Sequence, residues 1–212
     1  MCIIIHSPDG HIPTRHLRRS LIANPHGWGV MVWDGKEVVV EKGMSAERFW
    51  EVWPMRPDGP VVFHARVKSH GGKDLANCHP FAVPGHGLWM AHNGIIHQHA
   101  DKESPISDTR RFARDLLADM PADFLSNKAV RRLIADYVGT SKLAFMSEAD
   151  GMVTIINKRR GIPLRGRWYS NASFRQPKPE LLAKPYFTSG QSGQLKPMSL
   201  GGVQVDRKSV YR

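Results

Sequence analysis

Long apolar runs are missing from this sequence of 212 residues. The longest ones, such as Ile3–Ile5 and Val38–Val40, are far shorter than the roughly 20 apolar residues that a membrane-spanning helix needs. The N-terminus also has no basic segment followed by a long apolar stretch, so it does not predict a signal peptide. We therefore expect neither membrane insertion nor export.

Cysteine is scarce as well, because the chain has only Cys2 and Cys78. Two cysteines cannot build the disulfide framework that is typical of small secreted domains. Cys78 is expected to be a buried thiol or a loop residue. Few cysteines and no export signal together favour the reducing cytoplasm as the location.

Acidic residues are rare in the last quarter of the chain. Residues 158–212 carry 12 Lys/Arg against 2 Asp/Glu, whereas residues 1–157 carry 18 against 17. Such a cluster predicts contact with nucleic acid or an acidic partner, or a solvated tail. From residue 176 onward Pro, Lys, Gly, Ser and Gln dominate, which does not favour a packed fold. We therefore divide the chain into a domain at 1–175 and a basic extension at 176–212.

Apolar periodicity between turn signals predicts short strands and four helices. The helices are expected at Thr14–Ala23 with Thr14 as the cap, from Ser45 to Pro54, from Ser107 onward, and at Asn127–Tyr137. The stretch from Lys68 to Gly87 is expected to be mostly loop. Strands are expected at Cys2–His6, Val30–Trp33, Glu37–Lys42, Val61–Arg66, Leu88–His92, Leu143–Met146, Met152–Asn157 and Trp168–Ser170. This order predicts an α+β fold whose sheets are covered by helices.

Cys2 stands where removal of the initiator methionine would leave it with a free α-amine. A thiol has an ordinary pKa of about 8.5 and an α-amine one of about 7.7–8.0, so the amine can take the thiol proton near neutral pH. One residue would then supply both nucleophile and base. On position alone, a cysteine that merely begins a strand is the commoner case.

Six short motifs follow one another within the first 109 residues of the chain. They are Cys2, Asn24–Gly29, His64–Gly71, Asn77–Phe81, His92–Ile96 and Ser107–Thr109. Each is weak alone, but in this order they resemble the class II glutamine amidotransferase domain of the N-terminal nucleophile hydrolases. The resemblance runs from Cys2 to about Phe174 and implies a four-layer αββα sandwich.

The resemblance implies an activity and the residues that carry it out. Glutamine would be hydrolysed at its side-chain amide, to glutamate and ammonia, through a thioester on Cys2. The Asn93 side chain and the backbone N–H of Gly94 would form the oxyanion hole, where fixed dipoles suit a developing negative charge. Outside this motif set, an Asn-Gly pair is usually a tight turn.

Free glutamine carries an α-carboxylate and an α-ammonium group, so a selective site should pair both. By the resemblance, Arg66 grips the carboxylate in a forked geometry, and Asp108 takes the ammonium group. An acid at a helix start is otherwise explained by the helix dipole. Ser69, His70 and Trp28 are expected to bind the substrate around the nucleophile.

Two positions depart from the family pattern, and the histidines raise a separate question. Ser69 replaces a frequent threonine and keeps its hydroxyl, whereas the role of His26 stays open. All eleven histidines lie before residue 100. Their spacing is not that of a zinc site, and no Cys pair supports them. We expect core or surface histidines with satisfied hydrogen bonds, no metal and no cofactor.

Three functions stay open on this basis. Family members usually fuse the domain to a synthase, but the extension at 176–212 is too short for a second catalytic domain. The first is a stand-alone glutaminase that passes ammonia to a separate acceptor enzyme, and the second is an amidohydrolase acting on a γ-glutamyl compound. The third is a non-catalytic scaffold that binds nucleic acid through the basic C-terminus. A scaffold has no need of the catalytic set, which favours an enzyme.

Overall fold

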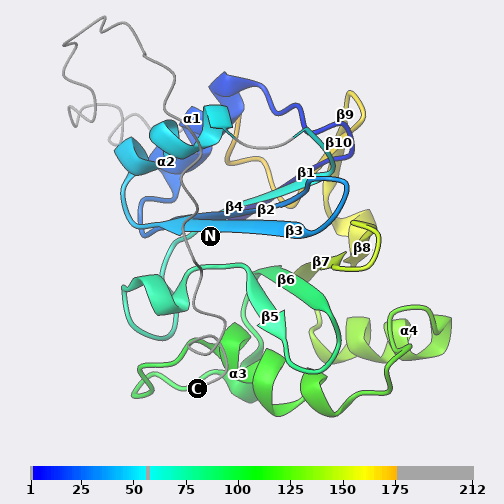
Figure 1. Cartoon of the computed structure of the whole chain (residues 1–212). Coiled ribbons are helices and arrows are strands. Elements are labelled where there is room, and N and C mark those ends of the chain that lie inside the picture. Colours follow the sequence, from blue (N-terminus) through cyan, green and yellow to red (C-terminus); the bar gives the residue numbers. More distant parts are fainter. Residues whose placement is uncertain (1, 56–57, 176–212) are drawn as a thin grey trace, which may run out of the picture.

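Two antiparallel sheets packed face to face form the centre of the computed structural model, which describes residues 2–55 and 58–175 (Figure 1). The first sheet has six strands in the order β3-β2-β4-β1-β10-β9. They are β1 (Ile3–Ser7), β2 (Trp28–Trp33), β3 (Val38–Gly43), β4 (Val61–Ala65), β9 (Ile162–Leu164) and β10 (Arg167–Tyr169). The N-terminal strand therefore lies inside this sheet, between β4 and β10.

The second sheet has four strands in the order β5-β6-β7-β8. They are β5 (Phe81–Val83), β6 (Leu88–Asn93), β7 (Lys142–Ser147) and β8 (Val153–Ile156). The helices α1 (Thr14–Ala23) and α2 (Ala46–Val52) cover the outer face of the first sheet. The helices α3 (Asp108–Asp115) and α4 (Lys128–Tyr137) cover the outer face of the second (Figure 1). The predicted four-layer αββα architecture is thus confirmed.

The side chains of β1 alternate between the two faces of the first sheet, so this strand contributes to two apolar clusters. Ile3 and Ile5 pack on the side of α1 and α2, whereas Ile4 lies in the cluster between the two sheets, with Met31 of the first sheet and Ala144 of the second. A third apolar cluster joins the second sheet to α3 and α4. Since side chains alternate between the faces of a strand, an uninterrupted apolar run marks a strand buried on both sides.

The predicted helices are confirmed, with one error in a cap. Ser45, Ser107 and Asn127 each accept a hydrogen bond from a backbone N–H in the first turn of their helices. Thr14 was expected to cap α1, but it is already the first helical residue and Pro13 holds the cap position without a side-chain bond. Proline fixes a backbone φ near −65°, so it can start this helix without the polar cap that we expected.

Two short strands were missed by the sequence prediction. β5 lies in the stretch expected to be loop, and β9 precedes the predicted β10. Both have only three residues, too few to show a period. The extension at 176–212 lies outside the described residues, so its division from the domain stays a prediction. Within the described part of the chain, no helix is long and apolar enough to cross a membrane.

Candidate active site

One pocket gathers most of the residues that the motifs single out. It lies where the N-terminus, the end of β4, the end of β6 and the start of α3 meet. Its lining consists of Cys2, Arg66, Val67, Ser69, His70, His79, His92, Gly94, Ser107, Asp108 and Thr109. Five separate stretches of the chain contribute, so only the fold brings them together.

Cys2 is held at the pocket by the backbone of the residue after Arg66. Its sulfur accepts a hydrogen bond from the Val67 nitrogen at 3.3 Å and can donate one to the Val67 oxygen at 3.4 Å. Burial raises the pKa of the Cys2 thiol, the positive charge of Arg66 lowers it and the negative charge of Asp108 raises it. A thiol in these surroundings needs a base before it can act as a nucleophile.

The backbone of Cys2 is fixed by two side-chain amides. Its carbonyl oxygen accepts hydrogen bonds from Nδ2 of Asn93 and from Nδ2 of Asn171, the latter at 2.7 Å. Asn93 Nδ2 also donates to the Ser170 hydroxyl at 2.7 Å, and that hydroxyl accepts from the Ile4 nitrogen at 2.8 Å. The segment after β10 thus locks the start of the chain against the end of β6.

Arg66 is a buried cation at the floor of the pocket, with only 2% of its surface exposed. Its backbone is tied to the segment before β2, because its nitrogen donates to Gly27 O at 2.8 Å and its oxygen accepts from His26 N at 2.9 Å. In the side chain, Nη2 donates to His70 O at 3.0 Å, while Nη1 has no partner among the described residues. A buried guanidinium with a free donor is suited to an anionic ligand.

Asp108 is the first residue of α3 and is also buried. Its Oδ2 accepts from the Ile96 nitrogen at 2.9 Å, and its Oδ1 accepts from the Thr109 hydroxyl at 3.3 Å. The Thr109 oxygen is in turn 2.7 Å from Nδ1 of His92. These contacts fix the carboxylate at one end of a pocket that holds Arg66 as well.

Gly94 lines the pocket, and its backbone could not carry a side chain. Its φ is +146°, and a Cβ would lie 2.7 Å from the Ser141 Cβ and 2.8 Å from its Cα. Asn93 precedes it, but its amide points to Cys2 O and Ser170 rather than into the pocket. The oxyanion role of Asn93 therefore stays a prediction, and its observed contact anchors the backbone of Cys2.

Trp28 lies elsewhere, contrary to the expectation that it borders the nucleophile. Its indole donates to Ser45 O at 2.6 Å and packs edge-on against Phe49. It lines a separate cavity of about 210 Å³ between α1 and α2. The alternation of β2 explains the difference, because Trp28 faces the helices that cover the sheet.

The remaining expected residues have clear positions. Ser69 and His70 both line the pocket, in the loop after β4. His26 lies outside the pocket lining, and its Nδ1 accepts a hydrogen bond from the Lys68 nitrogen at 3.0 Å. His26 thus fixes the loop that carries Ser69 and His70.

Three buried histidines lie at the pocket, where His79 and His92 line it and His64 stands behind them, and their surroundings correct our expectation of satisfied hydrogen bonds. His64 and His79 have ring centroids 4.0 Å apart, and His79 and His92 have them 6.3 Å apart. Burial lowers the pKa of His64 to about 3 and that of His92 to about 4, and it lowers the pKa of His79 well below its usual value. Both ring nitrogens of His79 lack a partner among the described residues.

Sequence reasoning did not assign His79, His92 or Thr109 to the pocket. Each belongs to a motif that we had singled out for a neighbouring residue, so the motif itself was the available signal. Within residues 2–55 and 58–175, no group of three or more His, Cys, Asp or Glu side chains has an arrangement that could hold a metal ion.

Comparisons with known proteins give partial matches. A stretch of 65 residues is 37% identical to the isomerizing glutamine–fructose-6-phosphate aminotransferase of Corynebacterium diphtheriae. The match covers 31% of this chain and 10% of that protein, so the chain corresponds to a small part of this relative. No family profile matches the chain.

Two solved structures match over most of this chain at low sequence identity. Glutamine phosphoribosylpyrophosphate amidotransferase from B. subtilis has a TM-score of 0.48 and 14% identity, over 80% of this chain and 41% of that one. A class II glutamine aminotransferase domain protein of Silicibacter pomeroyi has a TM-score of 0.44 and 16% identity, over 79% of this chain and 87% of that one. The ordered motifs and the αββα fold, together with the local identity to a glutamine-using enzyme, show that the chain resembles the class II glutamine amidotransferase domain.

Proposed function

We propose that this protein hydrolyses the side-chain amide of glutamine, with Cys2 as an N-terminal nucleophile. The observation that carries the proposal is the common pocket of Cys2, Arg66 and Asp108. A thiol, a buried cation and a buried carboxylate at one site match the amide, the α-carboxylate and the α-ammonium group of glutamine. Cys2 and Asp108 are more than one hundred positions apart in the chain, so chance proximity along the sequence does not explain the set.

The reaction would proceed in two steps once Met1 is removed. The α-amine of Cys2 takes the thiol proton, and the thiolate attacks the amide carbon to give a tetrahedral oxyanion. The C–N bond then breaks, a thioester forms, and the leaving nitrogen takes the proton from the α-ammonium group and departs as ammonia. Water next attacks the thioester, releases glutamate and restores the thiol. The α-amine is an adequate base because its ordinary pKa, about 7.7–8.0, is close to working pH.

Charge pairing would select the amino-acid end of the substrate. Nη1 of Arg66 is a buried donor without a partner among the described residues, which supports a role in binding a carboxylate. Asp108 keeps a fixed orientation through Ile96 N and Thr109 Oγ1, which suits it to an ammonium group. We infer that both contacts form in the bound state and exclude substrates that lack either charge.

The oxyanion would be stabilised by the backbone N–H of Gly94 and the amide of Asn93. Gly94 already lines the pocket. For this, the Asn93 amide would have to break its hydrogen bond to Cys2 O and turn toward the oxyanion on the reacting carbon. The freed carbonyl would keep its second bond, from Asn171, so the nucleophile stays anchored while Asn93 acts.

Ammonia would be passed to a separate acceptor enzyme.

Hydrolysis of glutamine is tested by a glutaminase assay that measures glutamate and ammonia, on the wild type, Cys2→Ala and Cys78→Ala. We expect Cys2→Ala to lose turnover. Cys78→Ala should keep it, because the buried Cys78 sulfur contacts Met44 and Asp74 O rather than the pocket. Turnover of γ-glutamyl peptides with no turnover of glutamine would assign the pocket to the amidohydrolase alternative. No turnover of either would favour a scaffold.

A further inference from the structure

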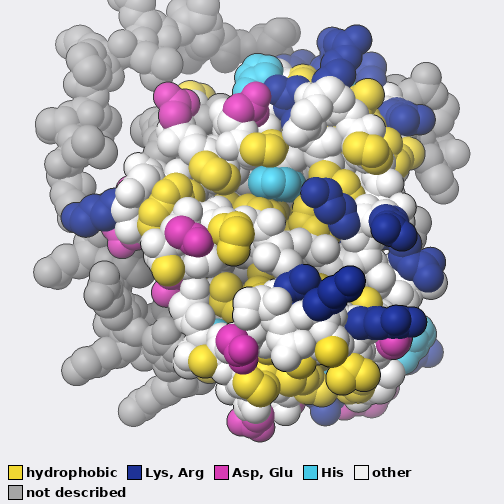
Figure 2. Space-filling view, turned by 90° about the vertical axis from the view of Figure 1, so that its right-hand side faces the viewer, with side chains coloured by type: hydrophobic (Ala, Val, Ile, Leu, Met, Phe, Trp, Pro, Cys, Tyr) yellow, Lys and Arg dark blue, Asp and Glu magenta, His cyan; other side chains and the backbone are white. Residues whose placement is uncertain are grey.

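A basic surface lies on the folded domain at the edge of the first sheet. It consists of Arg15 and Arg19 on α1, Arg165 and Arg167 on the β9–β10 hairpin, and the 3-10 turn Lys158–Arg160. Within residues 158–175 there are six Lys/Arg and no Asp/Glu. Figure 2 shows Lys and Arg side chains gathered along one side of the face that carries β8, β9 and β10.

The hairpin turn places an arginine where the backbone disfavours it. Leu164 pairs with Arg167, so Arg165 and Gly166 alone form the loop. Their φ angles are +50° and +77°. In such two-residue turns, Asn or Gly is preferred because other residues are strained at positive φ. An exposed arginine at this position costs stability without packing into a core, which points to a function outside the fold.

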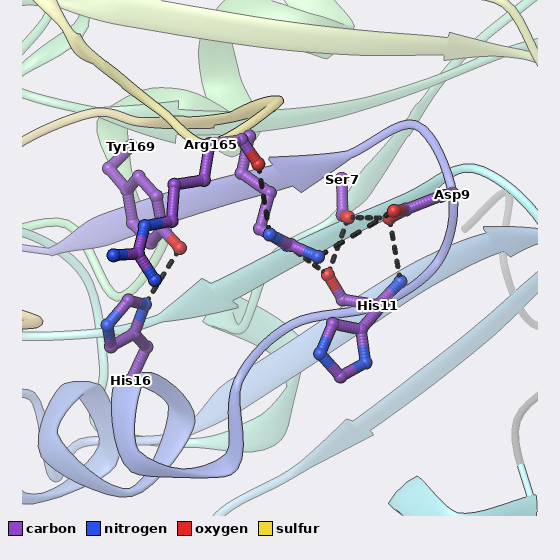
Figure 3. A network of polar contacts seen from close by, with 7 residues as sticks. Ser7, Asp9, His11, His16, Arg165 and Tyr169 are labelled. Atoms are coloured by element: carbon purple, nitrogen blue, oxygen red, sulfur yellow. Dashed lines mark hydrogen bonds and ion pairs between the residues drawn. The ribbon is translucent and has the colours of Figure 1, made fainter.

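Four arginines of the surface lie near one buried pair. His16 Nδ1 lies 2.8 Å from the Tyr169 hydroxyl, and the Arg165 side chain reaches back toward both (Figure 3). Besides burial, the charges of Arg15, Arg19, Arg167 and Arg165 lower the pKa of His16, so all four are near it. Like charges repel one another, and their gathering here is unfavourable unless an anion binds.

Arg167 is held in place by three side-chain contacts. Its Nε donates to His11 O and its Nη1 to Arg165 O, the latter at 3.0 Å, and Asp9 lies 3.6 Å from its Nη2 (Figure 3). Of the acidic residues, Asp9 alone is ion-paired to this surface in the described part of the chain. One carboxylate cannot neutralise seven cations, so the surface keeps a strong positive field.

We propose that this basic surface binds the phosphate backbone of nucleic acid. Six of its seven cations are arginines, whose planar guanidinium groups form paired hydrogen bonds with phosphate oxygens. The hairpin holds the turn at Arg165 and the Lys158–Arg160 turn about 10 Å apart, at about 3.3 Å per strand residue. In a DNA duplex, successive phosphates of one DNA strand are about 3.4 Å apart along the helix axis, so this spacing matches about three phosphates.

The surface is separate from the Cys2 pocket. Cys2 precedes β1, whereas Arg167 contacts Asp9 and His11, which follow its other end. Five strand residues span about 16 Å, so the two sites can act independently. Variants of the basic surface should therefore leave glutamine hydrolysis unchanged.

The test is fluorescence anisotropy of the full-length protein with a labelled DNA duplex of about 21 base pairs, two helical turns. We expect a Kd of about 10⁻⁵ M that weakens steeply between about 50 and about 200 mM salt. Arg165→Asn should lower the magnitude of the slope of log K, the binding constant, against log salt concentration by about 1. The double variant Arg159→Ser/Arg160→Ser should lower it by about 2. Arg165→Asn also relieves the strained turn, so its loss of binding cannot come from unfolding.

Two control variants show whether a change in the salt slope is specific to the basic surface. Arg165→Lys keeps the charge and should retain the slope. Arg48→Ser removes a cation of α2 that pairs with Glu51 and is not part of the basic surface, and it should retain the slope too. An unchanged slope in all basic-surface variants would overturn the proposal and assign any binding to residues 176–212. Equally tight binding of polyglutamate would assign the surface to an acidic protein instead.

Discussion

The sulfur of Cys2 lies 3.3 Å from the backbone nitrogen of Val67, the residue that directly follows Arg66. The Cys2 thiol and the buried Arg66 cation are therefore positioned by adjacent residues of one segment. A substrate held by Arg66 would have its reacting carbon at a distance from Cys2 that this segment fixes. Such positioning is a large part of what an enzyme contributes to an amide hydrolysis.

Arg66→Ala is expected to raise the Michaelis constant for glutamine about 30-fold or more, because losing one partner of a buried charge pair costs about 2–5 kcal/mol. Arg66→Lys is the matched control, since it keeps the charge but not the forked geometry, and its loss should be smaller. Steady-state kinetics with equal folding by circular dichroism measure this. An unchanged Michaelis constant in Arg66→Ala would contradict the carboxylate role.

Asp108→Asn tests the other end of the substrate. The amide keeps the shape of the side chain and an oxygen for the Ile96 N–H, so the fold should survive. We expect weaker binding of glutamine but no change for glutaramate, which has the amide and the carboxylate without the α-ammonium group. If both substrates lose affinity equally, Asp108 maintains the structure of the pocket and does not pair with the ammonium group.

Asn93→Ala should lower kcat by about 10²–10³-fold, the usual effect of removing one oxyanion donor. Because Asn93 also anchors Cys2 O, a purely structural loss must be distinguished. Ser170→Ala supplies that comparison, since Ser170 contacts Asn93 and Ile4 but not the pocket. A similar fall in kcat for both variants would show that anchoring, rather than oxyanion binding, is the role of Asn93.

The buried histidines predict a loss of stability in mild acid. Burial lowers the pKa of His64 to about 3 and that of His92 to about 4, against about 6.5 in an unfolded chain. Between these values the unfolded state binds protons that the folded state does not, so the free energy of unfolding falls as pH falls. Each histidine adds up to about 1.4 kcal/mol per pH unit to this slope.

Urea unfolding at several pH values between about 7 and about 5 measures that slope. His64→Gln should reduce it, because glutamine can keep the bond to His92 O without titrating. His97→Gln is the control, since His97 is exposed. An equal slope in the wild type and His64→Gln would show that the pKa of His64 is the same in the folded and unfolded states, and would contradict the effect of burial.

Much of the fold could be predicted because local signals agreed with it. The turn pairs at Asp34-Gly35 and Asp150-Gly151 marked hairpins, and Ser45 and Ser107 marked helix starts that the structure confirms. β5 and β9 were missed, because such short strands are set by pairing with β6 and β10 rather than by their own pattern, although the equally short β10 was predicted to within one residue.

The site was harder to predict where the direction of a side chain decides whether a residue reaches the pocket. Arg66, Asp108, Ser69 and His70 reach the same pocket as Cys2, because all follow a strand end or begin a helix. Trp28 does not, since a strand directs successive side chains to opposite faces and the sequence does not tell which face is which. Likewise, no spacing rule could place three buried histidines from three different segments next to one another.

The central claim is that Cys2, with a free α-amine, attacks the glutamine amide. It is tested most directly by treating the purified protein with 6-diazo-5-oxonorleucine, a glutamine-like electrophile, and mapping the label by intact and peptide mass spectrometry. The account predicts a mature chain that begins at Cys2, one label per chain on the N-terminal peptide, and loss of glutaminase activity in proportion to labelling. A label on Cys78, or fully active protein that retains Met1, would contradict it.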